Sequence, residues 1–189
     1  MSPDSAPLRL LIDPLDIGPD VRAIGLELNE EGDEDPARGS AADAVWAAAI
    51  PALAAGEPWV LDFTSHFDRL RDYCRAHGIA VREAAPSCVV VTPPEPGAFL
   101  EFVQRFEAET FGFRAGAAAA SGDADLENDL SSRGLDAYDR AFKRYSLCGI
   151  CDFENGFLTL LTEKFSSAEV LRRLRPAIDP LGARVVRPE

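Results

Sequence analysis

The fold is decided by residues 145–187, which read YSLCGICDFENGFLTLLTEKFSSAEVLRRLRPAIDPLGARVVR. Asn155 and Gly156 separate two apolar runs, and this dipeptide is the strongest short signal for a β-hairpin because both residues accept positive φ angles. Ser166 then precedes Glu169 by three residues, which is the spacing of a helix-capping box. The segment therefore predicts a hairpin, then a helix, and then a final strand.

A two-residue turn fixes the register that we predict for the hairpin. Cys151 then faces Leu160, and Phe153 faces Leu158, on the side of the ribbon that we assign to the core. The helix that follows carries apolar side chains at helical spacing as far as Pro176. We expect Pro176 to end or kink this helix, because proline disfavours a helical conformation in the residue before it.

Cys148 and Cys151 have the spacing of a common metal or redox motif. Residues i and i+3 of a regular strand point to opposite faces and lie roughly 10 Å apart along the chain. A disulfide or a shared zinc ion needs the two sulfurs close together, so joint chemistry requires a turn or bulge at Gly149 and Ile150. We expect instead two strand cysteines, with Cys151 in the core.

Six elements in the order βαββαβ are predicted between residues 58 and 114, and this is the order of the ferredoxin-like fold. The C-terminal part repeats the theme from a helix through the hairpin to a helix and a strand. The sequence therefore predicts an α+β protein that has a mixed sheet with helices on one face. The finer hypothesis is that two ferredoxin-like units share one core. The strand-like runs lie at 8–12, 21–28, 59–63, 79–83, 88–92, 111–114 and 183–186.

Composition along the chain suggests three parts. Residues 1–114 form an N-terminal α+β unit, and residues 135–189 form a C-terminal αββαβ unit that packs on the first. Residues 115–134 between them are rich in alanine, glycine and acidic side chains and have no sustained apolar period. We interpret this stretch as a mobile linker or lid, since long segments without structure are usually flexible or functional.

The charge of the chain restricts its partners. Acidic side chains exceed basic ones by 32 to 19, which gives a formal net charge of −13. Nucleic acids and anionic membranes need a basic surface, so we expect neither as a partner. No signal-like start and no membrane-spanning apolar stretch stand in the sequence, which predicts a cytoplasmic protein with reduced cysteines. The oligomeric state stays open.

Asp62 and His66 are the best candidate for catalysis, because they lie where a predicted strand meets a predicted helix, the end of such a unit that often binds ligands. Asp62 could orient His66, and His66 could act as a base or as a single metal ligand. Ser65 and Asp68 also fit a helix-capping box, which explains the same segment without chemistry. Motifs for nucleotide, zinc-protease or serine-hydrolase sites are absent, so the sequence predicts no cofactor.

Phe111 and Phe113 lie outside the helical phenylalanine stripe and next to the linker, and we predict that they meet a ligand or partner. Three functional hypotheses result. The first is a non-catalytic protein that binds a small molecule or a protein partner, through an exposed sheet face or edge strand. The second is an enzyme that uses Asp62 and His66, and the third is a thiol or metal protein that uses Cys148 and Cys151.

Overall fold

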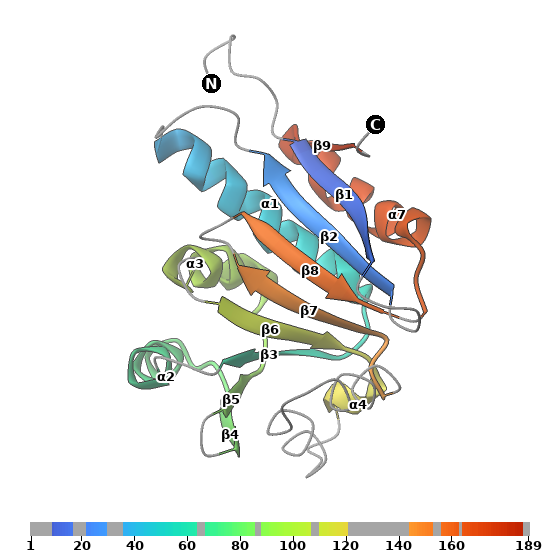
Figure 1. Cartoon of the computed structure of the whole chain (residues 1–189). Helices are drawn as coiled ribbons and strands as arrows, with labels where there is room; N and C mark the ends of the chain where they lie inside the picture. The colour runs from blue at the N-terminus through green and yellow to red at the C-terminus, as the bar shows by residue number, and fades with distance from the viewer. Residues whose placement is uncertain are drawn as a thin grey trace.

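Nine strands of the chain pair into one mixed sheet in the order β4-β5-β3-β6-β7-β8-β2-β1-β9 (Figure 1). The computed structural model describes residues 9–16, 22–29, 36–63, 67–85, 88–106, 110–120, 144–152, 156–162 and 164–186. The strands are β1 (Arg9–Asp16), β2 (Arg22–Asn29), β3 (Trp59–Phe63), β4 (Val81–Ala85), β5 (Cys88–Val91), β6 (Thr110–Ala115), β7 (Leu147–Asp152), β8 (Phe157–Leu161) and β9 (Arg184–Val186). The helices are α1 (Pro36–Ala54), α2 (Phe67–Ala76), α3 (Pro96–Phe106), the single turn α4 (Ala117–Ala120) and α7 (Ser167–Ile178), with a 3₁₀ turn at Asp179–Leu181.

The predicted α+β class and the mixed sheet are confirmed. From β3 to β6 the elements follow the predicted order, and each neighbouring pair of these strands is antiparallel. The boundaries differ slightly, since the run predicted at 79–83 forms a strand at Val81–Ala85.

The ferredoxin-like repeat is not confirmed. The N-terminal strands β1 and β2 lie between β8 and β9, so the C-terminal strands β7, β8 and β9 do not form a sheet of their own. β2 pairs antiparallel with β8, and β1 pairs parallel with β9. These pairings join the two ends of the chain in one sheet. The predicted linker lies only partly within the described residues, because residues 121–134 fall outside them.

The hairpin β7–β8 forms as predicted, but its register differs by two residues. Asp152 pairs with Phe157 and Cys151 with Leu158, so residues 153–156 connect the strands. Phe153 therefore lies outside the paired strands and outside the described residues. A shift of two keeps each side chain on its expected face, because side chains alternate with a period of two.

The start of α7 follows the predicted cap, but its end does not follow the prediction. Ser166 Oγ accepts a hydrogen bond from the Glu169 backbone N–H at 3.3 Å. Pro176 lies inside the helix, which continues to Ile178, so the helix does not end at the proline. The other alternative, a kink at Pro176, stays a prediction. Proline removes one backbone hydrogen bond, and the burial of Ile178 in the core stabilises the continued helix.

The main core lies between one face of the sheet and the helices α1, α2, α3 and α7. In Figure 1 the long helices α1, α3 and α7 lie behind the sheet, whereas α4 lies on the near side at the lower end. No described helix is both long and apolar enough to cross a membrane. The core combines aliphatic strand residues with large helix side chains, among them Leu26, Phe63, Leu158, Leu160, Trp46, Ile50, Phe99, Phe102 and Leu174.

Candidate functional site

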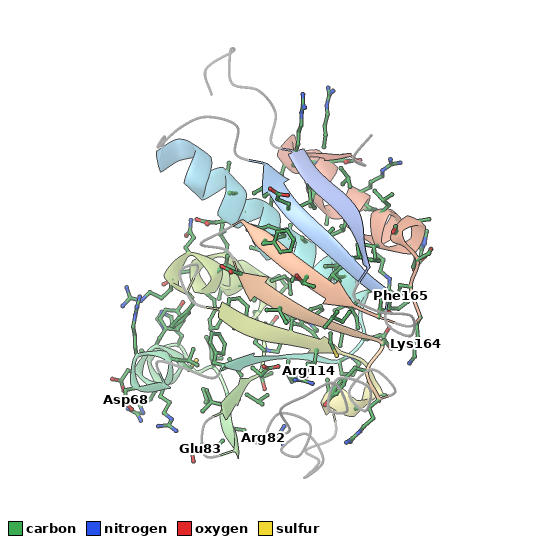
Figure 2. All side chains as sticks on the ribbon, in the orientation of Figure 1. Asp68, Arg82, Glu83, Arg114, Lys164 and Phe165 are labelled. Carbon is green, nitrogen blue, oxygen red and sulfur yellow. The ribbon has the colours of Figure 1, made fainter. Side chains whose placement is uncertain are left out.

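Asp62 lies on β3 and faces away from the helix-packed core. Its neighbours Leu61 and Phe63 point into the core, so alternation places the Asp62 carboxylate on the other face. Arg114 of β6, labelled in Figure 2, reaches Asp62 diagonally across the strand pair. Arg114 Nε donates a hydrogen bond to Asp62 Oδ2 at 2.9 Å. The two side chains are only 16% and 9% exposed, so they form a largely buried ion pair.

Arg114 is held from two sides. Its guanidinium carbon lies 5.5 Å from the centroid of the Tyr145 ring, which is within the range of a cation–π contact. Burial by itself would lower the pKa of Arg114, but the charge of Asp62 and its hydrogen bond outweigh burial and raise that pKa. Arg114 therefore stays charged, and one oxygen of Asp62 is engaged in binding it. His66, the predicted partner of Asp62, lies outside the described residues.

Gly112 makes room for the Asp62 carboxylate. The two residues are direct partners in the β3–β6 register. A Cβ atom at position 112 would overlap the carboxyl group of Asp62, so only glycine fits here without movement. Neither Arg114 nor Gly112 was predicted from the sequence. The signal was a glycine between two phenylalanines, since glycine inside a strand often marks a close approach by another group.

The two cysteines of β7 face opposite sides of the sheet, as the strand prediction requires. β7 pairs without interruption with β6 and β8, so no turn or bulge brings the sulfurs together. Cys151 is fully buried and Cys148 is 8% exposed. Burial, with a smaller contribution from the charge of Asp62, raises the pKa of Cys151 well above its usual value, which disfavours the reactive thiolate. In the described part of the chain, no group of three or more His, Cys, Asp or Glu side chains lies close enough together to hold a metal ion.

Gly149, between these cysteines, has a packing role. A Cβ atom there would lie 3.0 Å from the Phe113 ring and 3.2 Å from Leu158. The glycine therefore lets the Phe113 ring lie against the strand on the core side. Its regular strand conformation gives joint chemistry of Cys148 and Cys151 no support.

Phe111 and Phe113 lie in the core rather than at the surface. Both are buried, at 2% and 0% exposure. The Phe111 ring stacks on Phe63 with centroids 4.9 Å apart, and Phe113 meets Trp59 edge-on at 5.7 Å. Their side chains pack between the sheet and the helices, so neither ring is presented to a ligand at the surface in this arrangement.

The face of the sheet that turns away from the core holds a surface that we call the open face. Its centre is Ile150, which pairs with Gly112 on one side and Thr159 on the other. Ile150 is 38% exposed, and among the side chains whose burial the structure describes only Leu181 is another exposed large hydrophobic one. In Figure 1 none of the described helices lies in front of β7, β8 and β2. The open face consists of Glu27, Gly112, Ile150, Asp152, Phe157 and Thr159, all partly or fully exposed.

A hollow of about 300 Å³ lies near the lower end of the sheet, between α4 and the strands β3 to β5. Asp62 does not line this hollow, and the charged side chain among the lining residues is Arg82. The remaining lining is mainly aliphatic, with Val60, Val81 and Val90 from the strands and Ala119 and Ala120 from α4. This hollow therefore brings no pair of catalytic groups together.

Comparison of the chain with protein-family models, with curated proteins and with solved structures gave no match. The assignment of function therefore depends on the geometry of the chain itself.

Proposed function

We propose that this chain is a non-catalytic cytoplasmic protein that binds a protein partner or a small ligand on the open face of its sheet. The observation that carries the proposal is the exposure of Ile150 at the centre of that face. Contiguous apolar surface with a polar rim is typical of interaction sites, and the partly exposed Phe157 lies on the same face as Ile150. Protein interfaces have an apolar centre and a polar rim, and here Asp152 and Glu27 border Ile150 and Phe157.

A protein partner fits the open face better than a small molecule does. Small ligands are usually held in concave sites that cover most of their surface. The open face is formed by side chains that stand on one side of regular paired strands, and a glycine, Gly112, lies next to Ile150. Residues of the open face line neither the hollow beside α4 nor a second hollow between α7 and β9, and a surface spread over several strands is better matched by another protein.

The finer fold proposal concerns the elements from β3 to β6. Their sheet order, β4-β5-β3-β6 with all neighbours antiparallel, supports assigning them as one ferredoxin-like unit. The fold by itself does not determine a function. It explains why α2 and α3 lie on the same side of the sheet, because both connecting helices of such a unit cross the same face.

The two other hypotheses receive less support. Catalysis by Asp62 and His66 would need a carboxylate free to orient the imidazole, whereas Arg114 engages Asp62. Joint chemistry of Cys148 and Cys151 would need both sulfurs on one side of β7, whereas the strand directs them to opposite faces.

The test compares two substitutions that add the same charge at different exposed hydrophobic positions, Ile150→Glu and Leu181→Glu. Tagged wild-type chain and both variants are used to capture proteins from the cells that produce the chain. The proposal predicts proteins recovered with the wild type and with Leu181→Glu but lost with Ile150→Glu. Equal recovery with all three folded chains would contradict it.

A further inference from the structure

The strand β9 leaves one edge of the sheet open. It ends the strand order and pairs only with β1, and no described strand pairs with its outer side. An open strand edge carries backbone donors and acceptors that can bind an added strand. Several peptide-binding proteins recognise extended segments in this way, with side-chain pockets beside the edge that add specificity.

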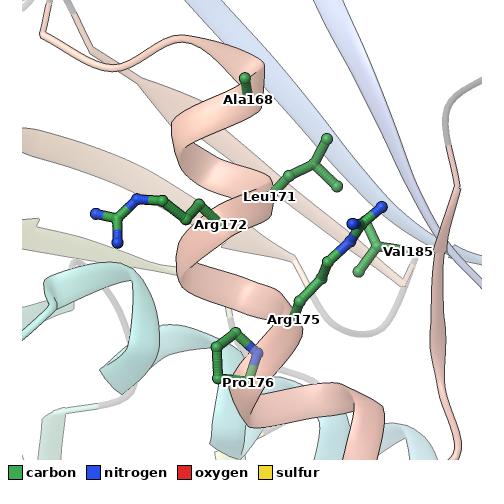
Figure 3. A pocket seen from close by; sticks show the side chains of 6 residues that line it. All are labelled: Ala168, Leu171, Arg172, Arg175, Pro176 and Val185. Atoms are coloured by element: carbon green, nitrogen blue, oxygen red, sulfur yellow. The ribbon is translucent and has the colours of Figure 1, made fainter.

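A hollow of about 500 Å³ lies beside this edge, between α7 and β9 (Figure 3). The residues from α7 recur at spacings of three and four, so they form one stripe that runs about 12 Å along the helix. Val185 supplies the wall from β9, and it points to the α7 side of the sheet because its partner Leu10 is buried there. We call this the α7–β9 hollow, and its lining is Ala168, Leu171, Arg172, Arg175, Pro176 and Val185.

The lining of the hollow offers apolar surface beside two arginines. Leu171, Pro176 and Val185 provide apolar surface, and Figure 3 shows Arg175 extending across the space towards β9. Arg172 is already bound by the Glu169 carboxylate, at 2.7 and 2.8 Å. Arg175 is exposed, and no acidic partner for it is found among the described residues.

The other side of the same edge carries two more arginines. Arg9 and Arg184 are direct cross-strand partners in the β1–β9 pair, and both are exposed. Like charges opposite each other on neighbouring strands repel. Within the described part of the chain neither has an acidic partner, so a carboxylate placed beside them would relieve this repulsion.

We propose that β9 is the docking edge for an extended segment of a partner protein in which apolar and acidic side chains alternate. The segment adds as a tenth strand. Alternation sends its apolar side chains into the α7–β9 hollow and its acidic ones towards Arg9 and Arg184, because successive strand residues face opposite sides. The positive charge of this edge, in a chain whose net charge is −13, selects for the acidic side chains.

This edge is separate from the open face around Ile150, so the inference goes beyond the proposed function and can fail independently of it. A second copy of the chain is a poorer occupant, because pairing two β9 edges would bring Arg184 of each copy close together. A small apolar carboxylate would use the hollow and Arg175 but would leave the strand edge unpaired.

The test uses synthetic peptides about eight residues long that alternate valine with glutamate. Binding to the full chain is measured by fluorescence anisotropy. We expect the glutamate peptide to bind, and the matched valine–lysine peptide to bind at least about tenfold more weakly. An added strand forms hydrogen bonds to the edge through every second residue only. Two peptides are therefore compared, one with methylated backbone nitrogens at all valines and one with methylated backbone nitrogens at all glutamates. One of these patterns should abolish binding, and the other should leave it intact.

Two variants locate the site. Arg184→Glu reverses the charge that faces the glutamates, and Arg175→Glu places a carboxylate in the hollow that takes the valines. Each should therefore weaken binding of the glutamate peptide at least about tenfold, whereas Arg75→Glu on α2 and Ile150→Glu should bind as the wild type does. Circular dichroism confirms that each variant is folded, and Arg175→Glu, on the exposed side of α7, remains a test if Arg184→Glu does not fold.

Three results would overturn the proposal: no binding at about 1 mM peptide, equal binding of the lysine peptide, or equal tolerance of both methylation patterns. Binding of laurate that depends on Arg175, without peptide binding, would overturn it in favour of a small carboxylate.

Discussion

At the scale of single residues, the part of the sheet around Asp62 depends on one missing side chain. Gly112 lies opposite Asp62, and a Cβ atom there would overlap the carboxylate. The carboxylate cannot simply move away, because Arg114 binds it at 2.9 Å. The neighbouring strand β6 thus accommodates a largely buried charge on β3, because it supplies both an arginine that pairs with the carboxylate and a glycine that leaves room for it.

Gly112→Ala should therefore lower the free energy of unfolding by about 1–3 kcal/mol, the usual cost of overfilling a packed site. Urea unfolding measures the change. Gly97→Ala in α3 is the matched control, because a Cβ atom at that position meets nothing within 4 Å. The control should be neutral or slightly stabilising, and equal losses in both variants would contradict the packing argument.

The Asp62–Arg114 ion pair gives a second prediction. Asp62→Asn keeps the size of the side chain but leaves the buried Arg114 charge without its partner, so we expect a loss of about 3 kcal/mol. Adding Arg114→Met should recover much of that loss, because no buried charge then remains. Urea unfolding of the two single variants and the double variant forms the thermodynamic cycle, and a strictly additive result would show that the pair does not interact.

The ion pairs of Glu169 predict that the stability of the chain depends on pH. Hydrogen bonds from Arg172 and then Arg173 lower its pKa from 4.5 to about 2. A lowered pKa in the folded state stabilises the protein above the unfolded pKa, and this contribution disappears as the pH falls towards 2. The stability difference between wild type and Glu169→Gln should thus be constant near neutral pH and shrink between 4.5 and 2. Glu95→Gln is the control, and a Glu169→Gln difference that does not change with pH would refute the assignment.

At the scale of elements, the hairpin was predictable in type and face but not in register. The Asn155-Gly156 signal locates the turn, and Gly156 does adopt a positive φ of 66°. The pairing of Asp152 with Phe157 leaves four connecting residues, where a two-residue turn was predicted. Contacts with a third strand favour this register, since the Leu28 backbone N–H donates to the Gly156 carbonyl at 2.9 Å. This contact joins residues that are far apart in the chain, so the local sequence of the hairpin could not predict it.

Gly156→Val should destabilise the chain by about 1 kcal/mol or more, because a β-branched residue is poorly accommodated at positive φ. A Cβ atom there would also lie 3.2 Å from the Leu28 carbonyl oxygen. Gly156→Asn should cost less, since asparagine tolerates this conformation. Thermal unfolding distinguishes the two, and an unchanged melting temperature in Gly156→Val would mean that the turn is misassigned.

The same distinction holds for helix α7. The cap by Ser166 was predictable because it depends on residues three apart. The continuation of the helix through Pro176 was not, because it follows from the burial of Ile178 against other elements. Local spacing therefore predicted the start of the element, and tertiary packing decided its end.

At the scale of the whole molecule, the element order was predictable and the assembly of the sheet was only partly so. The six elements from β3 to β6 follow from alternating apolar patterns and capping signals along the chain. The insertion of β1 and β2 between β8 and β9 joins residues more than 130 positions apart, as in the pairing of Leu26 with Leu158. No local pattern specifies such a pairing.

The candidate site shows the same limit. Asp62 was identified from its place at the end of a strand, but its partner Arg114 is 52 residues away and became apparent only through the β3–β6 register. The prediction for Phe111 and Phe113 rests on their position outside a helical stripe. In a strand, however, every second residue turns to the core, and both phenylalanines do so.

The most direct test of binding through the open face is site-specific photo-crosslinking in the cells that produce the chain. A photoreactive benzoylphenylalanine replaces Thr159, which lies beside Ile150 on the open face, and in a matched chain it replaces Asp72 on the outer side of α2. We predict a discrete crosslinked protein from position 159, absent from position 72 and lost when Ile150→Glu is added. Crosslinks of equal yield from both positions, or none from position 159, would contradict the proposal that the chain binds through its open face.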